Sequence, residues 1–170
     1  MYKNIISIKR SYVLNSRLID ELELFLYKIH ESDHKTTPVV HTPGNANLSL
    51  QHKKILVVDD DMRNVFALSA VLEANQMEVV IASDGKESLD QLKKHQDIDL
   101  VLMDIMMPEM DGYEAMKLIR NDLKLTTPII AVTAKAMVGD REKCIAAGAS
   151  DYIAKPLDMQ KLLSLMRVWL

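Results

Sequence analysis

The chain has 170 residues, of which 48% are hydrophobic, and its net charge is −3. This hydrophobic fraction is too high for a disordered protein, and the slightly acidic balance argues against a dedicated nucleic-acid-binding protein. The sequence contains no apolar run of about 18 residues that would insert into a membrane. A single cysteine, Cys144, cannot form an intramolecular disulfide, and the first ten residues lack the apolar stretch of a signal peptide. We therefore expect a cytoplasmic, reducing location.

The first 52 residues are predicted to form a helix and a linker. Large apolar residues recur at intervals of three and four, which predicts an amphipathic helix within residues 1–35. They are Leu14, Leu18, Leu22, Phe25, Leu26 and Ile29. Residues 36–52 are rich in Pro, Asn, Ser and Thr without a sustained period, which indicates a linker. The apolar side of the helix needs a partner, which is the rest of the chain, a second copy or another protein.

One motif in this first segment matches a known metal site by spacing alone. His30-Glu31-Ser32-Asp33-His34 fits the H-E-x-x-H pattern of zinc proteases. That site needs a stable helix inside a domain, whereas here Pro38 follows closely and 52 residues cannot bury a catalytic core. We reject zinc catalysis for this stretch, and we also do not favour a phosphoaccepting histidine there.

Residues 53–170 alternate between strand and helix patterns. Short apolar runs predict five strands, which are Lys54–Val58, Met77–Ala82, Asp99–Met103, Pro128–Val132 and Asp151–Ala154. Helical spacing predicts five helices, which are Arg63–Asn75, Gly85–His95, Tyr113–Leu123, Val138–Ala147 and Asp158–Leu170. Such alternation is typical of an α/β fold, a parallel sheet with helices on both faces.

Polar residues stand at the ends of four of these strands. The triplet Asp59–Asp61 follows the first strand, Asp104 ends the third, and Thr133 and Lys155 follow the fourth and fifth. Because ligands bind at the carboxyl ends of parallel strands, these side chains are expected to meet. Clustered carboxylates stay ionised together when a cation lies among them, and an all-oxygen set suits Mg²⁺. A carboxylate beside Mg²⁺ and a lysine is a nucleophile towards phosphorus, so the residues predict a Mg²⁺-dependent aspartyl-phosphate site. Asp61 is expected to cap the following helix instead of binding metal.

Four motifs occupy these strand ends: KILVVDDD (Lys54–Asp61), VLMDIMMPEMDG (Val101–Gly112), AVTAKA (Ala131–Ala136) and GASDYIAKPL (Gly148–Leu157). With them, residues 53–170 resemble the receiver domain of response regulators in bacterial two-component systems. The stretch SRLIDELELFLYKI resembles the connector that precedes the C-terminal receiver of hybrid sensor histidine kinases, and VDDDMRNVFALSAVLEAN resembles those terminal receivers. A truncated or split descendant of such a kinase is therefore one interpretation. The resemblance implies a flavodoxin-like, doubly wound (βα)5 sheet with strand order 2-1-3-4-5.

The resemblance also implies roles for particular residues. Asp104 would accept a phosphoryl group from a phosphohistidine. Mg²⁺ would be bound by Asp59, Asp60, Asp104 and the backbone carbonyl of Met106. Lys155 would pair with the phosphoryl group.

Two further residues and one peptide bond match the switching parts of the family. Thr133 matches the switch hydroxyl and Tyr152 the aromatic switch, while Lys155–Pro156 matches a peptide that is usually cis. Lys135 would border the phosphorylation site.

The expected function is that of a signalling receiver, not of a conventional enzyme, although it would catalyse its own phosphorylation and dephosphorylation. The phosphodonor would be a histidine kinase or a histidine phosphotransfer protein. Because no DNA-binding domain follows Leu170, we expect the signal to pass to a downstream protein through residues 136–170. We expect neither binding to nucleic acid nor insertion into a membrane. A homodimer is a further possibility. The alternatives are a scaffold that no longer takes phosphate, and a phosphatase of the haloacid dehalogenase type. The latter rests on Asp59-x-Asp61 but has Arg63 where Thr or Val is expected.

Overall fold

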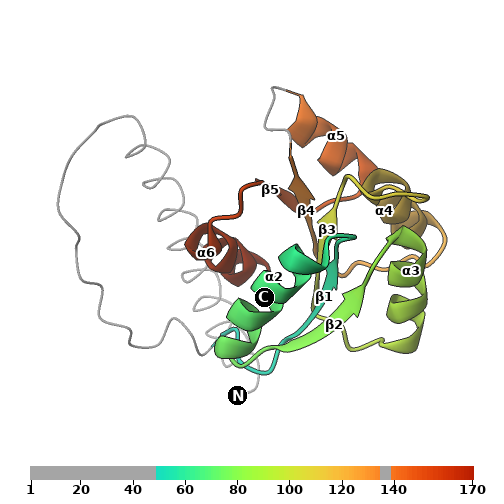
Figure 1. Cartoon of the computed structure of the whole chain (residues 1–170). Helices are drawn as coiled ribbons and strands as arrows, with labels where there is room; N and C mark the ends of the chain where they lie inside the picture. Colours follow the sequence, from blue (N-terminus) through green and yellow to red (C-terminus); the bar gives the residue numbers. More distant parts are fainter. Residues whose placement is uncertain (1–48, 135–138) are drawn as a thin grey trace, which may run out of the picture.

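The structure is a computed structural model, and it describes residues 49–134 and 139–170 (Figure 1). The predicted helix within residues 1–35, most of the linker, Lys135 and the first predicted residue of the fourth helix lie outside these ranges. The strands are β1 (Lys54–Val58), β2 (Glu78–Ala82), β3 (Leu100–Asp104), β4 (Ile129–Thr133) and β5 (Asp151–Ala154). The helices are α2 (Met62–Ala74), α3 (Gly85–Lys94), α4 (Gly112–Asn121), α5 (Asp140–Ala147) and α6 (Met159–Trp169).

All four strand pairs are parallel, and the order β2-β1-β3-β4-β5 confirms the predicted flavodoxin-like topology. Every residue of β3 and β4 is buried, because these strands lie inside the sheet with helices on both faces. β1, β3 and β4 end at the same edge of the sheet, and this register brings the residues that follow β1 close to the last residues of β3 and β4.

Alternate side chains of the strands divide the core into two layers. One buried cluster joins Leu56, Val101 and Ile129 to residues of α3, α4 and α5. The other joins their neighbours in the strands, such as Ile55 and Leu102, to residues of α2 and α6. Helices α2 and α6 therefore cover one face of the sheet, and α3, α4 and α5 cover the other (Figure 1).

Aspartates begin four of the helices. The side chain of each accepts a hydrogen bond from a backbone N–H of the first turn, and the four residues are Asp61, Asp84, Asp111 and Asp158. The predicted capping role of Asp61 is thereby confirmed. At the other end of α5, Gly148 has φ +111°, a backbone conformation that favours glycine, and it stops the helix where the sequence predicts.

The packed unit begins before β1. Leu50 is fully buried in the cluster under α2 and α6, and the His52 N–H donates to the Gln76 carbonyl at 2.8 Å. The chain therefore enters the domain on the face covered by α2 and α6. Within the described ranges, no helix has the length and apolar content that crossing a bilayer requires.

Candidate functional site

Two buried carboxylates and one lysine meet at the carboxyl edge of the sheet. Asp59 follows β1 and is 2% exposed, and Asp104 ends β3 and is 3% exposed. The Lys155 Nζ, which follows β5, donates to Oδ2 of both carboxylates at 2.9 Å. Residues separated by up to 96 positions in the chain are thus joined through one ammonium group.

The orientation of Asp59 depends on a residue that the sequence reasoning missed. The Asn64 side-chain amide donates to both carboxylate oxygens of Asp59, at 3.2 and 3.0 Å, and the Asp61 N–H donates to Oδ1 at 2.8 Å. Asn64 lies in the first turn of α2, immediately after the acidic triplet. Its position in the sequence could have identified it as a site residue, because the first turn of α2 starts directly beside the site.

Burial and mutual charge shift the ionisation of this cluster. Burial raises the pKa of Asp104, and the nearby charge of Asp59 acts in the same direction, while the Lys155 ammonium opposes both. Burial disfavours the Lys155 ammonium, but its hydrogen bonds to Asp104 and Asp59 outweigh this effect and raise its pKa. Asp61 is bound by Arg63 instead, and this hydrogen bonding lowers the pKa of Asp61 to about 2. Asp61 is therefore occupied at the helix start, outside the cluster.

The acidic residues fit a hard divalent cation. Asp59, Asp60 and Asp104 each offer one carboxylate oxygen, and these three oxygens lie within 4.8 Å of one another. Asp60 is exposed, so the group opens to solvent on one side, as a cation that retains water ligands requires. The Met106 N–H donates to Asp104 Oδ1 at 3.4 Å, which places this residue beside the group. Binding by the Met106 carbonyl stays a prediction.

The two predicted switch residues lie on neighbouring strands. Thr133 is the buried last residue of β4, and its carbonyl accepts a hydrogen bond from the Lys155 N–H at 2.7 Å. Tyr152 is half-buried on β5, opposite Ala131, and packs against the cluster under α3, α4 and α5. The Lys155–Pro156 peptide is cis. Switching by Thr133 and Tyr152 stays a prediction.

A glycine next to the predicted phosphoacceptor has a role beyond the turn that the sequence indicates. A Cβ built on Gly112 would lie 2.2 Å from the backbone oxygen of Asp104. The Gly112 N–H also donates to the Ile105 carbonyl at 3.1 Å. Only glycine allows the start of α4 to approach the end of β3 this closely.

The variant Gly112→Ala is therefore expected to be destabilised by about 1–3 kcal/mol, because backbone atoms must move to admit the methyl group. Since the Asp104 backbone is among these atoms, we also expect weaker Mg²⁺ binding. Urea unfolding measures the first effect, and calorimetric titration with MgCl₂ measures the second. Lys117→Ala, an exposed position in the same helix, is the control and should change neither. Unchanged stability in Gly112→Ala would contradict the close approach.

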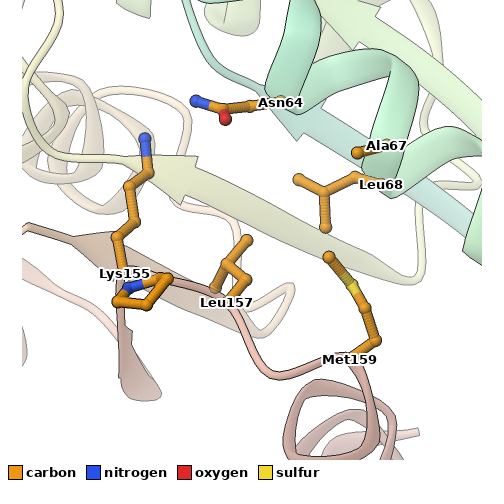
Figure 2. Close-up of a pocket in the computed structure, with 7 residues that line it drawn as sticks. Asn64, Ala67, Leu68, Lys155, Leu157 and Met159 are labelled. Carbon is orange, nitrogen blue, oxygen red and sulfur yellow. The ribbon is translucent and has the colours of Figure 1, made fainter.

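A pocket lies beside the lysine, between α2 and the β5–α6 connection. It is lined by Asn64, Ala67, Leu68, Lys155, Pro156, Leu157 and Met159. In Figure 2 the Lys155 amine and the Asn64 amide lie at one end of this pocket, and the apolar side chains of Leu68 and Met159 lie at the other. The pocket beside Lys155 therefore has a polar end and an apolar end.

Known proteins match both the sequence and the fold. The Autoinducer 2 sensor kinase/phosphatase LuxQ of Vibrio vulnificus is 40% identical over 132 residues, which are 78% of this chain and 15% of that kinase. A receiver domain of a sensor histidine kinase from Pseudomonas aeruginosa, solved with magnesium in its active site cleft, is 36% identical. Its TM-score is 0.63, over 69% of this chain and 97% of that one.

A complex of two proteins also contains a similar fold. The receiver domain of the response regulator Ssk1, solved with the histidine phosphotransfer protein Ypd1 of Saccharomyces cerevisiae, is 26% identical, with a TM-score of 0.64 over 68% of this chain and 93% of that one. The family model of the response regulator receiver domain matches residues 55–167. This match covers both the sheet and the acidic site, and the chain belongs to the response regulator receiver domain family.

Proposed function

We propose that the chain is a phosphoacceptor in a two-component phosphorelay, in which Asp104 takes a phosphoryl group from a phosphohistidine. The observation that carries this proposal is the contact of one lysine with two buried carboxylates, beside a third that is exposed. A purely structural ion pair does not need a third carboxylate, that of Asp60, beside the two that contact the lysine at an open edge of the sheet. An acceptor site needs a nucleophile, a metal-binding pair and a fixed positive charge, and this group offers a side chain that suits each role.

In this proposal a carboxylate oxygen of Asp104 attacks phosphorus, a P–O bond forms, and the P–N bond breaks with its electron pair returning to the imidazole. Asp59, Asp60, Asp104 and the Met106 carbonyl would hold Mg²⁺, which supplies positive charge to the phosphoryl oxygens. Lys155 would stay near Asp104 and neutralise the phosphoryl group after transfer. Asn64 would keep Asp59 in position through its two hydrogen bonds.

Phosphorylation would then shift a pre-existing equilibrium of the receiver. Thr133 would move towards the phosphoryl group and Tyr152 would turn inward, which would change the surface of α5, β5 and α6 for a downstream protein. The donor would be a histidine kinase or a histidine phosphotransfer protein. The complex of Ypd1 with the receiver domain of Ssk1 supports a donor of the second kind.

Acetyl phosphate with Mg²⁺ tests this function without a cognate donor. Transfer to Asp104 releases acetate, and a phosphate-affinity gel should resolve a retarded band. EDTA should abolish that band, because the carboxylates then lack the cation that neutralises the phosphoryl oxygens. If no band appears with acetyl phosphate or with a phosphorylated histidine phosphotransfer protein, the scaffold alternative replaces the proposal.

Docking of a protein donor predicts a second, separable effect. Phe66 of α2 is 68% exposed. Met62, one helical turn before Phe66, and Met106, two residues after Asp104, are also exposed. An exposed aromatic residue on the helix that starts at the site is a suitable docking anchor. Phe66→Ala should slow transfer from a phosphorylated histidine phosphotransfer protein by about tenfold, as expected for an anchor that contributes more than about 1 kcal/mol.

The same variant should react normally with acetyl phosphate, which needs no docking. Glu73→Ala, at an exposed position near the other end of α2, is the control and should behave as the unchanged chain. Equal slowing with both donors would mean that Phe66 supports the site itself.

A further inference from the structure

Two of the methionines differ from the others in their exposure to solvent. The sequence contains 11 methionines, and all except Met1 and Met137 lie in the described ranges. Met62 is 46% exposed and Met106 is 61% exposed. The methionines in the core under α3, α4 and α5 are at most 8% exposed, and these are Met103, Met107 and Met116. Solvent therefore reaches the first two far more readily than these three.

Both exposed methionines flank the proposed acceptor site. Met106 is two residues after Asp104, and its N–H donates to Asp104 Oδ1 at 3.4 Å. Met62 begins α2, and the N–H of the residue before it, Asp61, donates to Asp59 Oδ1 at 2.8 Å. Each buried carboxylate of the site is thus followed closely in the chain by an exposed thioether. Both thioethers belong to the surface proposed above for donor docking.

A peroxide converts a methionine thioether into a polar group. One peroxide oxygen is transferred to a lone pair of the sulfur, the O–O bond breaks, the sulfur loses two electrons, and hydrogen peroxide is reduced to water. A partner that packs on this surface must then bury the polar oxygen of the sulfoxide, which costs free energy. Carboxylates and ammonium groups do not react in this way, so Asp59, Asp104 and Lys155 keep their chemistry.

The single thiol of the chain is a poor competitor for the peroxide. Cys144 is fully buried in the core under α3, α4 and α5. Burial also raises the pKa of its thiol, which keeps the sulfur in the less reactive protonated form. The exposed thioethers are therefore the sulfur atoms of the described residues that meet an oxidant first.

We propose that Met62 and Met106 form a reversible oxidation site, through which a peroxide slows phosphoryl transfer from a protein donor. This inference rests on the proposed phosphoacceptor function and adds a regulation of the same site. The two sulfoxides weaken docking of the donor, while the acceptor carboxylate stays intact for a small donor. Methionine sulfoxide reductases reverse the modification, because they convert the sulfoxide back to the thioether.

Treatment of the full chain with hydrogen peroxide tests the proposal. The protein is desalted before any donor is added, so that only the receiver is oxidised. Peptide mapping by mass spectrometry should find Met62 and Met106 oxidised ahead of Met103 and Met116. Transfer from a phosphorylated histidine phosphotransfer protein should slow by about tenfold, as expected when an interface must bury an unpaired polar group. The reaction with acetyl phosphate should persist, and methionine sulfoxide reductases should restore transfer from the protein donor.

Two variants show which sulfur atoms are responsible, each compared with its own untreated sample. Met62→Leu combined with Met106→Leu keeps both side chains apolar but removes both sulfur atoms, so peroxide should no longer slow transfer. Met110→Leu removes the sulfur of a half-buried methionine in the loop that follows β3. This matched control should stay as sensitive to peroxide as the unchanged chain.

Three outcomes overturn the inference. Peroxide that still slows transfer to the double variant would place the effect at another residue. An unchanged transfer rate after full oxidation of Met62 and Met106 would mean that the sulfoxides do not disturb docking. Equal slowing with acetyl phosphate would mean that peroxide damages the site itself. Failure of the proposed function is seen separately, because the untreated chain would then accept no phosphoryl group from either donor, and the inference would fall with it.

Discussion

Asp104→Asn is expected to abolish the phosphorylated band with acetyl phosphate and Mg²⁺. The amide of asparagine has nearly the shape of the carboxylate but lacks the anionic oxygen that attacks phosphorus. The fold should persist, because the substitution removes one of two mutually repelling charges at a buried position where burial already raises the pKa. A phosphate-affinity gel measures the loss, and thermal unfolding verifies the fold.

Asp111→Asn is the matched control for this variant. Asp111 is exposed at the start of α4, where its side chain accepts from the Glu114 N–H, and asparagine caps a helix equally well. The control should be phosphorylated like the unchanged chain. Persistence of the band in Asp104→Asn would refute the assigned acceptor. If Asp59→Asn, and not Asp104→Asn, abolishes hydrolysis of a phosphomonoester, the phosphatase alternative is correct.

Lys155→Met is expected to lower the free energy of unfolding by about 3 kcal/mol in EDTA at neutral pH. Removing one partner of a buried ion pair leaves uncompensated charge, which costs more than the pair itself contributes. Here two carboxylates, Asp59 and Asp104, lose the same ammonium. Urea unfolding measures the loss. Added Mg²⁺ should recover part of it, because a cation that binds only the folded chain stabilises that state.

The pH dependence of this loss has a definite sign. The pKa of Asp104 is already raised in the folded chain, and without Lys155 it should rise further. A carboxyl group with a raised folded pKa destabilises the fold progressively as the pH increases through the interval between its unfolded and folded values. The deficit of Lys155→Met should therefore be smallest in acid, where the Asp104 carboxyl is protonated, and should grow towards neutral pH.

Lys54→Met provides the control, since Lys54 also pairs with two carboxylates, those of Glu78 and Asp97, which are both largely exposed. Solvent screens exposed ion pairs and makes their contribution to stability small, so the control should lose little. Equal losses in the two variants would contradict a special role for burial at the site.

The backbone of the domain was largely predictable because its signals are local. β1 and β5 have the predicted bounds, since each is a short apolar run with polar flanks. β3 and β4 begin and end one residue later than predicted, because pairing with neighbouring strands decides where a ladder stops. α4 begins at Gly112, one residue early, because the Asp111 side chain already caps the turn there.

The composition of the site was predictable only in part. Parallel topology brings strand ends together, so the sequence alone places Asp59, Asp104 and Lys155 at one edge of the sheet. The hydrogen bonds of Asn64 and the close packing at Gly112 could not be predicted, because the first depend on the direction of a side chain and the second on how closely the start of α4 lies against the Asp104 backbone. The amphipathic pattern of residues 14–29 likewise predicts an apolar stripe without indicating what covers it.

The burial of Leu50 determines where a stable fragment of this protein can begin. A fragment that starts at the first strand would include every strand and every acidic residue of the site, yet it would lack one core side chain. Truncating a buried leucine costs about 2–5 kcal/mol, a large share of the stability of a domain of this size. Any gene fusion, excision or natural recombination that preserves the folded receiver must therefore join the chain at Ser49 or earlier.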